Sequence, residues 1–264
     1  MKLYKVVKNI DGKLISPYQK FEFEVGKKYI CNDFDINTKN DCSTGFYATG
    51  IEGLPYAFRN LPTYEIWECE VGGKSVEFDI YKRRYEYFEL LRKVEKKEII
   101  TLAKNKEQEL GWKLSEALYP INPFIDRKCS EVTEQDIELL KQWASIRASV
   151  WASVWTSVGI SVRDSVGNSV RDSVEASVGG SVRTSVEASV WESVWESVWA
   201  YISSLFTNIK KWKYIDHEEG INPFQPSIDL WGKGLVPSFD GKIWRLHGYQ
   251  GKVLWEGKIE RSGE

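Results

Sequence analysis

The sequence contains few of the residues that bind metals or form disulfides. Its 264 residues include one Met, two His and four Cys, and the cysteines (Cys31, Cys42, Cys69, Cys129) form no CxxC pair. A structural zinc site needs about four Cys or His ligands close together, so we expect neither a metal nor another cofactor. Scattered cysteines are typical of reduced thiols, which favours a cytoplasmic protein.

Long apolar runs and an excess of one charge are also missing. No stretch of about 18 apolar residues occurs, and residues 1–8 lack the apolar run of a signal peptide, so no membrane contact is predicted. Basic and acidic residues nearly balance, at 36 and 38. This balance indicates that nucleic acid is not a partner.

What the sequence does contain is a strict repeat. The 56 residues from Ser145 to Ala200 are fourteen units of four, nearly all Ser-Val-x-x. Because only the first two positions are constant, Ser and Val are expected to face a constant environment and the other two positions mostly water. Five of the 12 tryptophans occupy the third position near the two ends of this array: Trp151, Trp155, Trp191, Trp195 and Trp199.

Two structures compete for the array. In an α-helix a feature repeated every four residues drifts by about 40° per unit, so no single partner could follow it along the whole array. In a β-solenoid each unit would form one short side and one corner. Ser, Val and Asp are mediocre helix formers, and Gly159, Gly167, Gly179 and Gly180 are worse. Composition therefore favours the solenoid, and one long helix stays open as the alternative.

The flanking segments predict an α+β protein in four parts. Residues 1–105 form a strand-rich domain, 106–144 a helical connector that caps the array, 145–200 the array, and 201–264 a capping helix and a hairpin module. Thr133 with Asp136 resembles a capping box, Tyr201–Lys213 has helical spacing, and Asp240-Gly241 is a hairpin turn signal. The phrase Ile-Asn-Pro-Phe occurs at 121–124 and again at 221–224, as if one docking segment caps both ends.

Two stretches resemble uncharacterised phage and bacterial proteins. Cys42-x-x-Gly-Phe-Tyr-Ala48 is similar to the Gly-Phe-His-Ala motif of an N-terminal domain of unknown function, with Tyr47 in place of His. Gly234–His247, read as GLVPSFDGKIWRLH, resembles a tail found in such proteins beside Ser-Val-x-x repeats. The resemblance implies a phage or bacterial context and no particular activity.

A second resemblance concerns the same motif. Gly45-Phe-Tyr-Ala-Thr49 is similar to an element of ADP-ribosyltransferase-like folds. That resemblance implies that Tyr47 stacks on nicotinamide and that a glutamate, Glu68 or Glu70, holds the ribose hydroxyl. Lys5 stands where those enzymes have Arg or His.

These features predict a non-enzymatic structural or interaction protein whose array is a spacer or an oligomerisation scaffold. A protein partner or self-association is expected, and the five array tryptophans either form the interaction surface or pack on the flanking domains. One alternative is a transferase-like or nucleotide-binding N-terminal domain displayed on the array. Another is a phage protein that sequesters a host factor. Ser238, Asp240 and His247 do not predict a hydrolase, because no Gly-x-Ser-x-Gly elbow is present.

Overall fold

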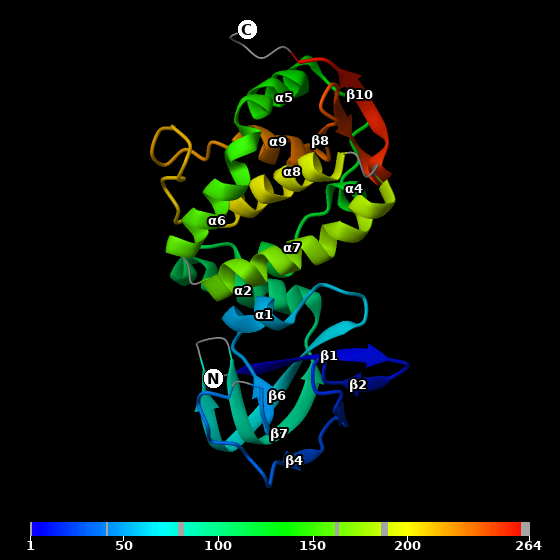
Figure 1. Cartoon of the computed structure of the whole chain (residues 1–264). Coiled ribbons are helices and arrows are strands. Elements are labelled where there is room, and N and C mark those ends of the chain that lie inside the picture. Colours follow the sequence, from blue (N-terminus) through cyan, green and yellow to red (C-terminus); the bar gives the residue numbers. More distant parts are fainter. Residues whose placement is uncertain (1, 41, 79–81, 162–163, 186–189, 260–264) are drawn as a thin grey trace. The chain divides into compact units, whose positions relative to one another are not determined.

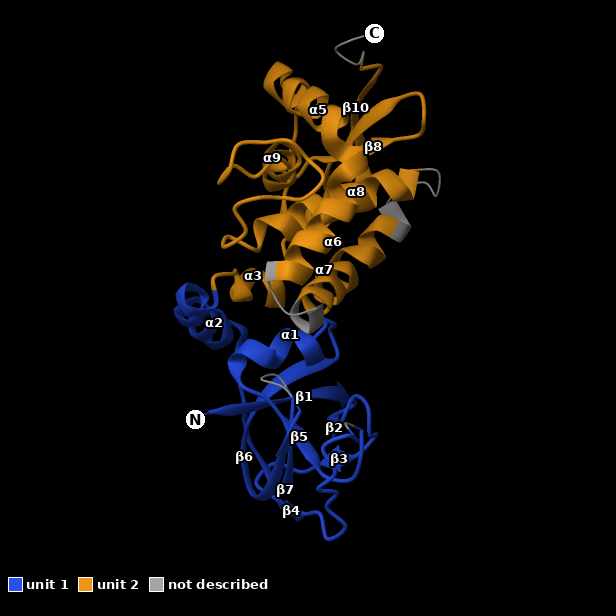
Figure 2. Ribbon diagram, turned by 60° about the vertical axis from the view of Figure 1, so that its left-hand side comes forward, with its two compact units in different colours: residues 1–110 blue, residues 111–264 orange. Residues whose placement is uncertain are grey.

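The structure is a computed structural model that describes residues 2–40, 42–78, 82–161, 164–185 and 190–259. Two compact units divide the chain, Met1–Leu110 and Gly111–Glu264 (Figure 2). The connector from Gly111 onward, the array and the C-terminal module thus belong to the second unit, whereas residues 106–110 of the connector belong to the first. Within the array, residues 162–163 and 186–189 lie outside the described residues.

Unit 1 is built on an antiparallel sheet (Figure 1). Its strands are β1 (Leu3–Ile10), β2 (Lys13–Ile15), β3 (Glu22–Phe23), β4 (Lys28–Ile30), β5 (Phe46–Ala48), β6 (Tyr64–Glu77) and β7 (Arg83–Lys93). The strand order is β3-β2-β1-β6-β7-β4, and β5 pairs with the start of β7. In the long strands β6 and β7, apolar and polar residues alternate, the pattern that predicts a β-strand.

The core of unit 1 is aromatic. Phe23, Phe46 and Phe88 are buried, with ring centroids 5.0 to 6.4 Å apart. Short helical elements complete the unit: η1 (Ile51–Gly53), α1 (Leu54–Ala57) and α2 (Lys96–Leu110). Aromatic pairs at such distances add to the stabilisation that burial provides.

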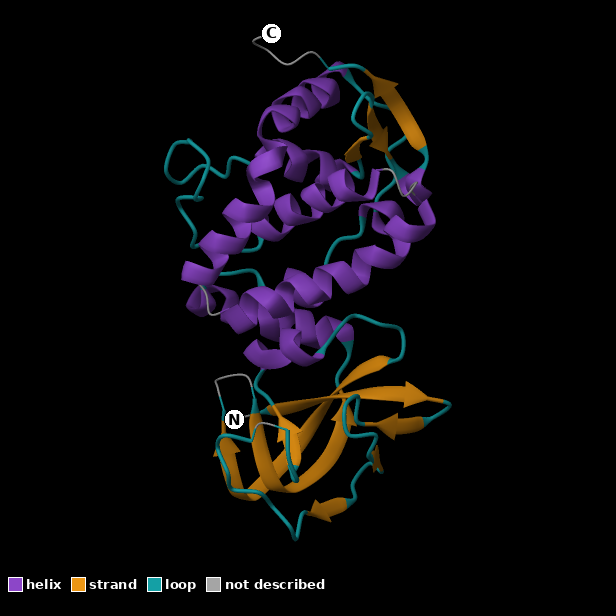
Figure 3. Cartoon of the chain, viewed as in Figure 1, coloured by secondary structure: helices purple, strands orange, loops and turns teal. Residues whose placement is uncertain are grey.

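Unit 2 is mainly helical, with a small sheet (Figure 3). Its helices are α3 (Leu114–Leu118), α4 (Pro123–Asp126), α5 (Glu134–Ile146), η2 (Arg147–Ser149), α6 (Val150–Ser161), α7 (Asp164–Ser185), α8 (Trp191–Ser204), α9 (Gln225–Lys233) and η4 (Tyr249–Gly251). Its strands are β8 (Val236–Phe239), β9 (Trp244–His247) and β10 (Val253–Gly257), in the order β10-β9-β8.

The predicted β-solenoid is wrong. The described part of the array is helical and forms α6, α7 and α8, which contact one another. The alternative of one long helix is also not what is observed, since the array is divided among several helices. The repeat valines at 150, 154 and 158 on α6, at 170, 174, 178 and 182 on α7, and at 194 and 198 on α8 are all buried. Tertiary packing of the valines has therefore overridden the weak helix propensity of the sequence.

The rotation of the Ser-Val stripe around a helix explains why the array forms short helices. Over the 12 residues of α6 the Ser-Val stripe turns by only about 120°, which one packed face can cover. The 22-residue α7 drifts further, but different neighbours cover it along its length: α3 and α4 as well as α6 and α8. Gly167 is close to α6, because a Cβ there would lie 2.8 Å from Val158 Cγ1. A glycine that weakens an isolated helix here permits two helices to approach.

The flanking predictions have mixed outcomes. Thr133 and Asp136 form the predicted capping box at the start of α5. Asp240-Gly241 lies between β8 and β9, where a hairpin turn was expected. The helix predicted over Tyr201–Lys213 is wrong beyond Ser204, where α8 ends. No helix in the described ranges is long and apolar enough to cross a membrane.

Candidate functional site: the repeat helices and their outer faces

The repeat serines form hydrogen bonds with extended backbone. Phe239 N donates to Ser193 Oγ at 2.8 Å, and Ser197 Oγ donates to the Pro237 carbonyl at 3.4 Å. Four residues along a helix rise about 6 Å, and two residues along a strand about 6.8 Å, so the spacings match. Strand β8 is at the edge of its sheet, and α8 thus supplies hydroxyls to backbone groups that would otherwise lack partners.

Serines on the other two repeat helices also form hydrogen bonds with flanking backbone. Ser173 Oγ donates to the Ala117 carbonyl at 2.6 Å, and Ser157 Oγ accepts from Lys213 N at 3.0 Å. These four serines are therefore small polar groups that fix flanking segments onto the helices. The buried Ser153 hydroxyl on α6 is an exception, because it forms no hydrogen bond with the described residues. A buried hydroxyl without a partner is costly, so the flanking segments stabilise the array where they supply one.

The two Ile-Asn-Pro-Phe phrases are the same structural device. Asn122 Oδ1 accepts from Phe124 N at 3.1 Å, and Asn222 Oδ1 accepts from Phe224 N at 3.0 Å. Asn122 Nδ2 donates to Ser181 Oγ and Asn222 Nδ2 to Ser203 Oγ, both at 2.9 Å. Both phenylalanines are fully buried. Each phrase is thus a turn in which asparagine donates a hydrogen bond to a helical serine. The capping of both array ends stays a prediction, because Ser181 lies within the array and Ser203 lies after it.

The outer positions of the array present aromatic rings to solvent. Trp151 and Trp155 on α6 are 56% and 41% exposed, and their rings are nearly parallel with centroids 6.4 Å apart. Trp199 on α8 is 9% exposed and meets both rings edge-on, at 6.5 and 6.2 Å. The Arg171 guanidinium on α7 lies 5.6 Å from the Trp155 ring. We call Trp151 and Trp155 the tryptophan pair.

The five predicted surface tryptophans therefore differ in their surroundings. Trp191 and Trp195 on α8 are half-buried and Trp199 is buried, so these three contribute more to packing than to an exposed surface. Of the five, only the tryptophan pair is largely exposed to solvent. Sequence alone could not separate them, because all five hold the same position in the repeat.

The exposed half of α6 carries no charge. Its outer residues are Trp151, Ala152, Trp155, Thr156, Gly159 and Ile160, and no Asp, Glu, Lys or Arg occurs in Val150–Ser161. At 100° per residue these six lie on one side of the helix, opposite the buried valines. A helix that is apolar on its inner face and uncharged on its outer face is unusual at a protein surface. We call these six residues the α6 outer face.

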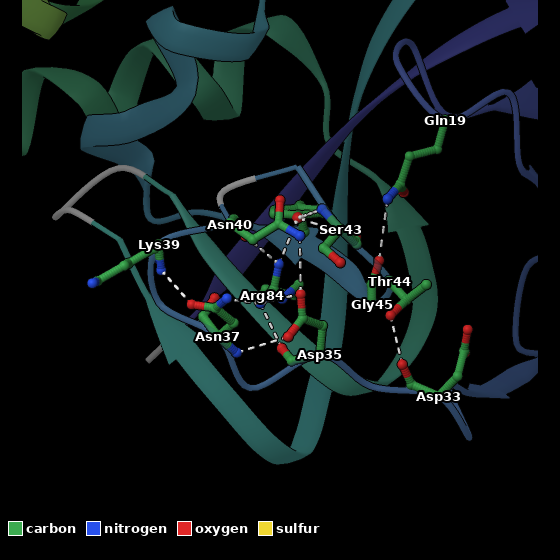
Figure 4. Close-up of polar contacts among 11 residues, drawn as sticks. Gln19, Asp33, Asp35, Asn37, Lys39, Asn40, Ser43, Thr44, Gly45 and Arg84 are labelled. Atoms are coloured by element: carbon green, nitrogen blue, oxygen red, sulfur yellow. Dashed lines mark hydrogen bonds and ion pairs between the residues drawn. The ribbon is translucent and has the colours of Figure 1, made fainter.

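Tyr47, a candidate in the transferase interpretation, packs against a buried arginine, Arg84. Figure 4 shows Arg84 among the loop residues Asp35, Asn37 and Asn40. Arg84 is fully buried and donates to the carbonyls of Asp35, Asn37 and Asn40 and to the Tyr47 hydroxyl. The guanidinium thus occupies a ring of oxygens such as a loop offers to a metal ion. Sequence reasoning missed Arg84, although the Asp33-x-Asp35-x-Asn37 spacing was a signal for a cation-binding loop.

The Tyr47 side chain is fully engaged in this arrangement. Its hydroxyl also accepts from Ser43 N at 2.9 Å, and its ring stacks on Phe78 with centroids 6.5 Å apart. The Lys82 ammonium lies 5.1 Å from the same ring. These contacts make Tyr47 a structural anchor of the loop that precedes β5.

The structure does not bring Tyr47 together with the candidate glutamates. Tyr47 pairs with Arg84 on β7, whereas Glu70 is opposite Glu89 on the same strand, about 17 Å further along. Glu68 lies beyond it and forms ion pairs with Arg92 at 2.7 Å and Lys2 at 3.5 Å. Three residues expected around one nicotinamide ribose therefore occupy separate places on the sheet.

Lys5 lies inside the aromatic core of unit 1. It is 8% exposed, and its ammonium is 5.8 Å from the centre of the Phe23 ring. Burial lowers the pKa of Lys5 to about 8, against a smaller opposing effect of Cys69. Burial likewise raises the pKa of the Cys69 thiol to about 12, so this cysteine is not a thiolate nucleophile.

The serine–histidine pair of the C-terminal hairpin is structural. Ser238 Oγ lies 2.7 Å from His247 Nε2, and His247 Nδ1 lies 3.0 Å from the Gly251 carbonyl. Ser238 is completely buried, so a substrate could not reach its hydroxyl. Asp240 instead binds Arg245 at 2.7 Å. The geometry agrees with the expectation that these residues form no hydrolase triad.

One cavity of unit 2 has a volume of about 480 Å³. Its lining includes Tyr201, Trp231, Lys210 and Asn222. Tyr201 and Trp231 are buried and stack on each other with centroids 5.3 Å apart, so the cavity exposes little aromatic surface. Among the residues whose positions are described, no group of three or more His, Cys, Asp or Glu could hold a metal ion.

Comparisons with known proteins add no relative. No family model, no curated protein and no solved structure matches this chain.

Proposed function

We propose that this chain is a non-enzymatic interaction protein whose repeat helices form a compact scaffold for binding another protein surface. The tryptophan pair is the observation that carries the proposal. Two adjacent indoles that are 56% and 41% exposed lie on a helix face without charge. Exposed, clustered tryptophans of this kind are typical of protein interfaces, where they contribute much of the binding energy.

The arrangement of the array supports a scaffold rather than a long spacer. Three repeat helices contact one another, and their serines hold β8 and the connector in place. Such a body has a rigid inner side and leaves the third and fourth repeat positions free to define a surface. A rigid helix face is a good support for aromatic anchors, because little side-chain freedom is lost on binding.

Hydroxyl-radical footprinting with residue-level mass spectrometry tests this proposal. In a dilute, monomeric sample of the full chain, Trp151 and Trp155 should be oxidised readily. The buried Trp143 and Trp231 should be protected and serve as internal controls.

Protection of the tryptophan pair in a sample shown to be monomeric would contradict the proposal. That result would mean that the indoles are covered within the chain and offer no surface to a partner.

A further inference from the structure

We infer that the tryptophan pair receives a cationic side chain of the partner protein, an arginine, which stacks on the exposed ring of Trp151. This inference rests on the proposed function and names the chemistry of the partner at the same surface. Arginines that already stack on aromatic rings of unit 2, and the charges beside the pair, support it.

Two arginines of unit 2 already lie on aromatic rings. The Arg171 guanidinium is 5.6 Å from the centre of the Trp155 ring. The Arg147 guanidinium is 5.0 Å from the centre of the Phe239 ring and 5.4 Å from that of Trp244. A cation is attracted to the face of an aromatic ring, and tryptophan attracts it most strongly. One member of the tryptophan pair thus already holds the kind of contact that a partner would make with the other.

The ring of Trp151 is open to a cation from outside the chain. Trp151 is 56% exposed, and no cation of the described residues lies over its ring. Helix α6 has no Lys or Arg that could fold back onto it. Arg147 precedes Trp151 by four residues, but its guanidinium lies on Phe239 and Trp244 and is paired with Glu196.

The charges beside the pair favour a cation over an anion. Next to Trp155, Arg171 is paired with two carboxylates, Asp172 at 2.7 Å and Glu175 at 3.8 Å. One basic group thus faces two acidic groups, which leaves a surplus of negative charge when all three are ionised. A positive group of a partner meets a complementary charge here, whereas a carboxylate would be repelled.

Among cationic side chains, arginine fits this surface better than lysine. Its guanidinium is planar and weakly hydrated, so it can lie flat on a ring at a low cost in lost hydration. The ammonium of lysine is compact and strongly hydrated. Arginine and tryptophan are also the residues that contribute most often to the binding energy of protein interfaces.

The test compares two probes that differ in charge and little in shape. N-acetyl-arginine amide carries the guanidinium, and N-acetyl-citrulline amide carries a neutral urea group in its place. Each is titrated into the full chain at constant ionic strength, and NMR follows the indole N–H signals of Trp151 and Trp155. The arginine probe should bind about two- to fivefold more tightly than the citrulline probe, with its largest shift at Trp151.

Three variants locate the site. Trp151→Leu keeps an apolar side chain but removes the ring, so the preference for the arginine probe should disappear. Trp191→Leu is the matched control and should keep the preference, because Trp191 holds the same repeat position on α8 and is half-buried. Arg171→Gln removes the internal cation from Trp155, so the arginine probe should then shift the Trp155 signal as well. Circular dichroism checks that the helices of each variant are intact.

Three results would overturn the inference. The first is equal binding of both probes by the wild-type chain, and the second is a preference for arginine that survives Trp151→Leu. The third is a Trp155 signal in Arg171→Gln that the arginine probe does not move, a result that does not depend on the folding of Trp151→Leu. With the tryptophan pair readily oxidised in the monomer, the proposed function would still stand, and the partner would bind through apolar contact. Protection of the pair in the monomer would remove both.

Discussion

Helices α6 and α7 are built from the same four-residue unit but differ on their outer sides. Inside, both bury a row of valines, from Val150 to Val158 on α6 and from Val170 to Val182 on α7. Outside, α7 carries paired charges, whereas α6 carries two stacked tryptophans and no charge. The inner positions thus determine the fold, and the outer positions determine the surface that each helix presents.

The repeat therefore has one explanation on its inner side and another on its outer side. The identical inner positions are explained by the packing of valines and serines, which requires no particular function. The outer positions indicate a binding partner only where they carry exposed apolar side chains instead of polar ones. Four predictions test whether the inner and outer positions have these different roles. The first concerns the buried valines, which are alike on α6 and α7.

Val154→Asp and Val174→Asp should destabilise unit 2 to a similar and large extent. Each would place a carboxylate without a partner in a fully buried position, at a cost of about 4 kcal/mol or more. Urea unfolding followed by circular dichroism measures the loss. A large effect on one helix and a negligible effect on the other would show that their inner sides are not equivalent.

Asn122→Leu should have a smaller effect, about 2 kcal/mol. Asn122 is buried and donates to both Ser181 Oγ and the Ser177 carbonyl, so leucine removes two hydrogen bonds to α7. Asn222→Leu is the matched variant on α8 and should cost less, because Asn222 is half-buried and its amide has one serine partner among the contacts described above. The same urea experiment compares them, and equal losses would argue against burial as the cause.

Two glycines of α7 should respond with opposite signs. Gly180→Ala meets nothing within 4 Å, so it should stabilise the helix by up to about 1 kcal/mol. Gly167→Ala would bring its Cβ to 2.8 Å from Val158 Cγ1 on α6, and this clash should cancel or reverse the gain. Thermal unfolding separates the two. Equal stabilisation by both would contradict close packing of α6 on α7 at Gly167.

The smallest effect is expected for Glu175→Gln on the outer side of α7. Burial raises the pKa of Glu175, and the nearby Asp172 adds to this against the opposing effect of Arg171. A carboxyl group with a raised pKa binds its proton more tightly in the folded state, so its contribution to stability falls as pH rises through and just above the ordinary glutamate pKa.

The difference in unfolding free energy between wild type and Glu175→Gln, followed across that pH interval, checks the sign. The glutamine variant should lose less stability than wild type as pH rises. At neutral pH the two should agree to within about 0.5 kcal/mol, as for most surface changes. Strong destabilisation by glutamine would mean that the charged outer face of α7 has a structural role of its own.

Structural features that depend on neighbouring residues could be predicted correctly from the sequence. The capping box at Thr133 and the hairpin at Asp240-Gly241 depend on residues a few positions apart. The helical array was not predicted because helix propensity argued against it. Its stability comes from valines on three separate helices, and sequence does not show which segments will cover them.

The candidate surface was predictable only in part. The repeat pattern located five tryptophans, but the exposure of Trp151 and Trp155 depends on where α8 and the C-terminal segments pack. The arginine-filled loop of unit 1 was missed because Arg84 is more than forty residues from the carbonyls of Asp35, Asn37 and Asn40 that it binds. Contacts at such separations are set by the fold.

Hydroxyl-radical footprinting of the unmodified chain in dilute, monomeric solution tests the central claim most directly. The α6 outer face, left uncharged where α7 is charged, predicts that Trp151 and Trp155 are oxidised much faster than the buried Trp143 and Trp231. Equal protection of all four tryptophans in the monomer would contradict an exposed tryptophan pair.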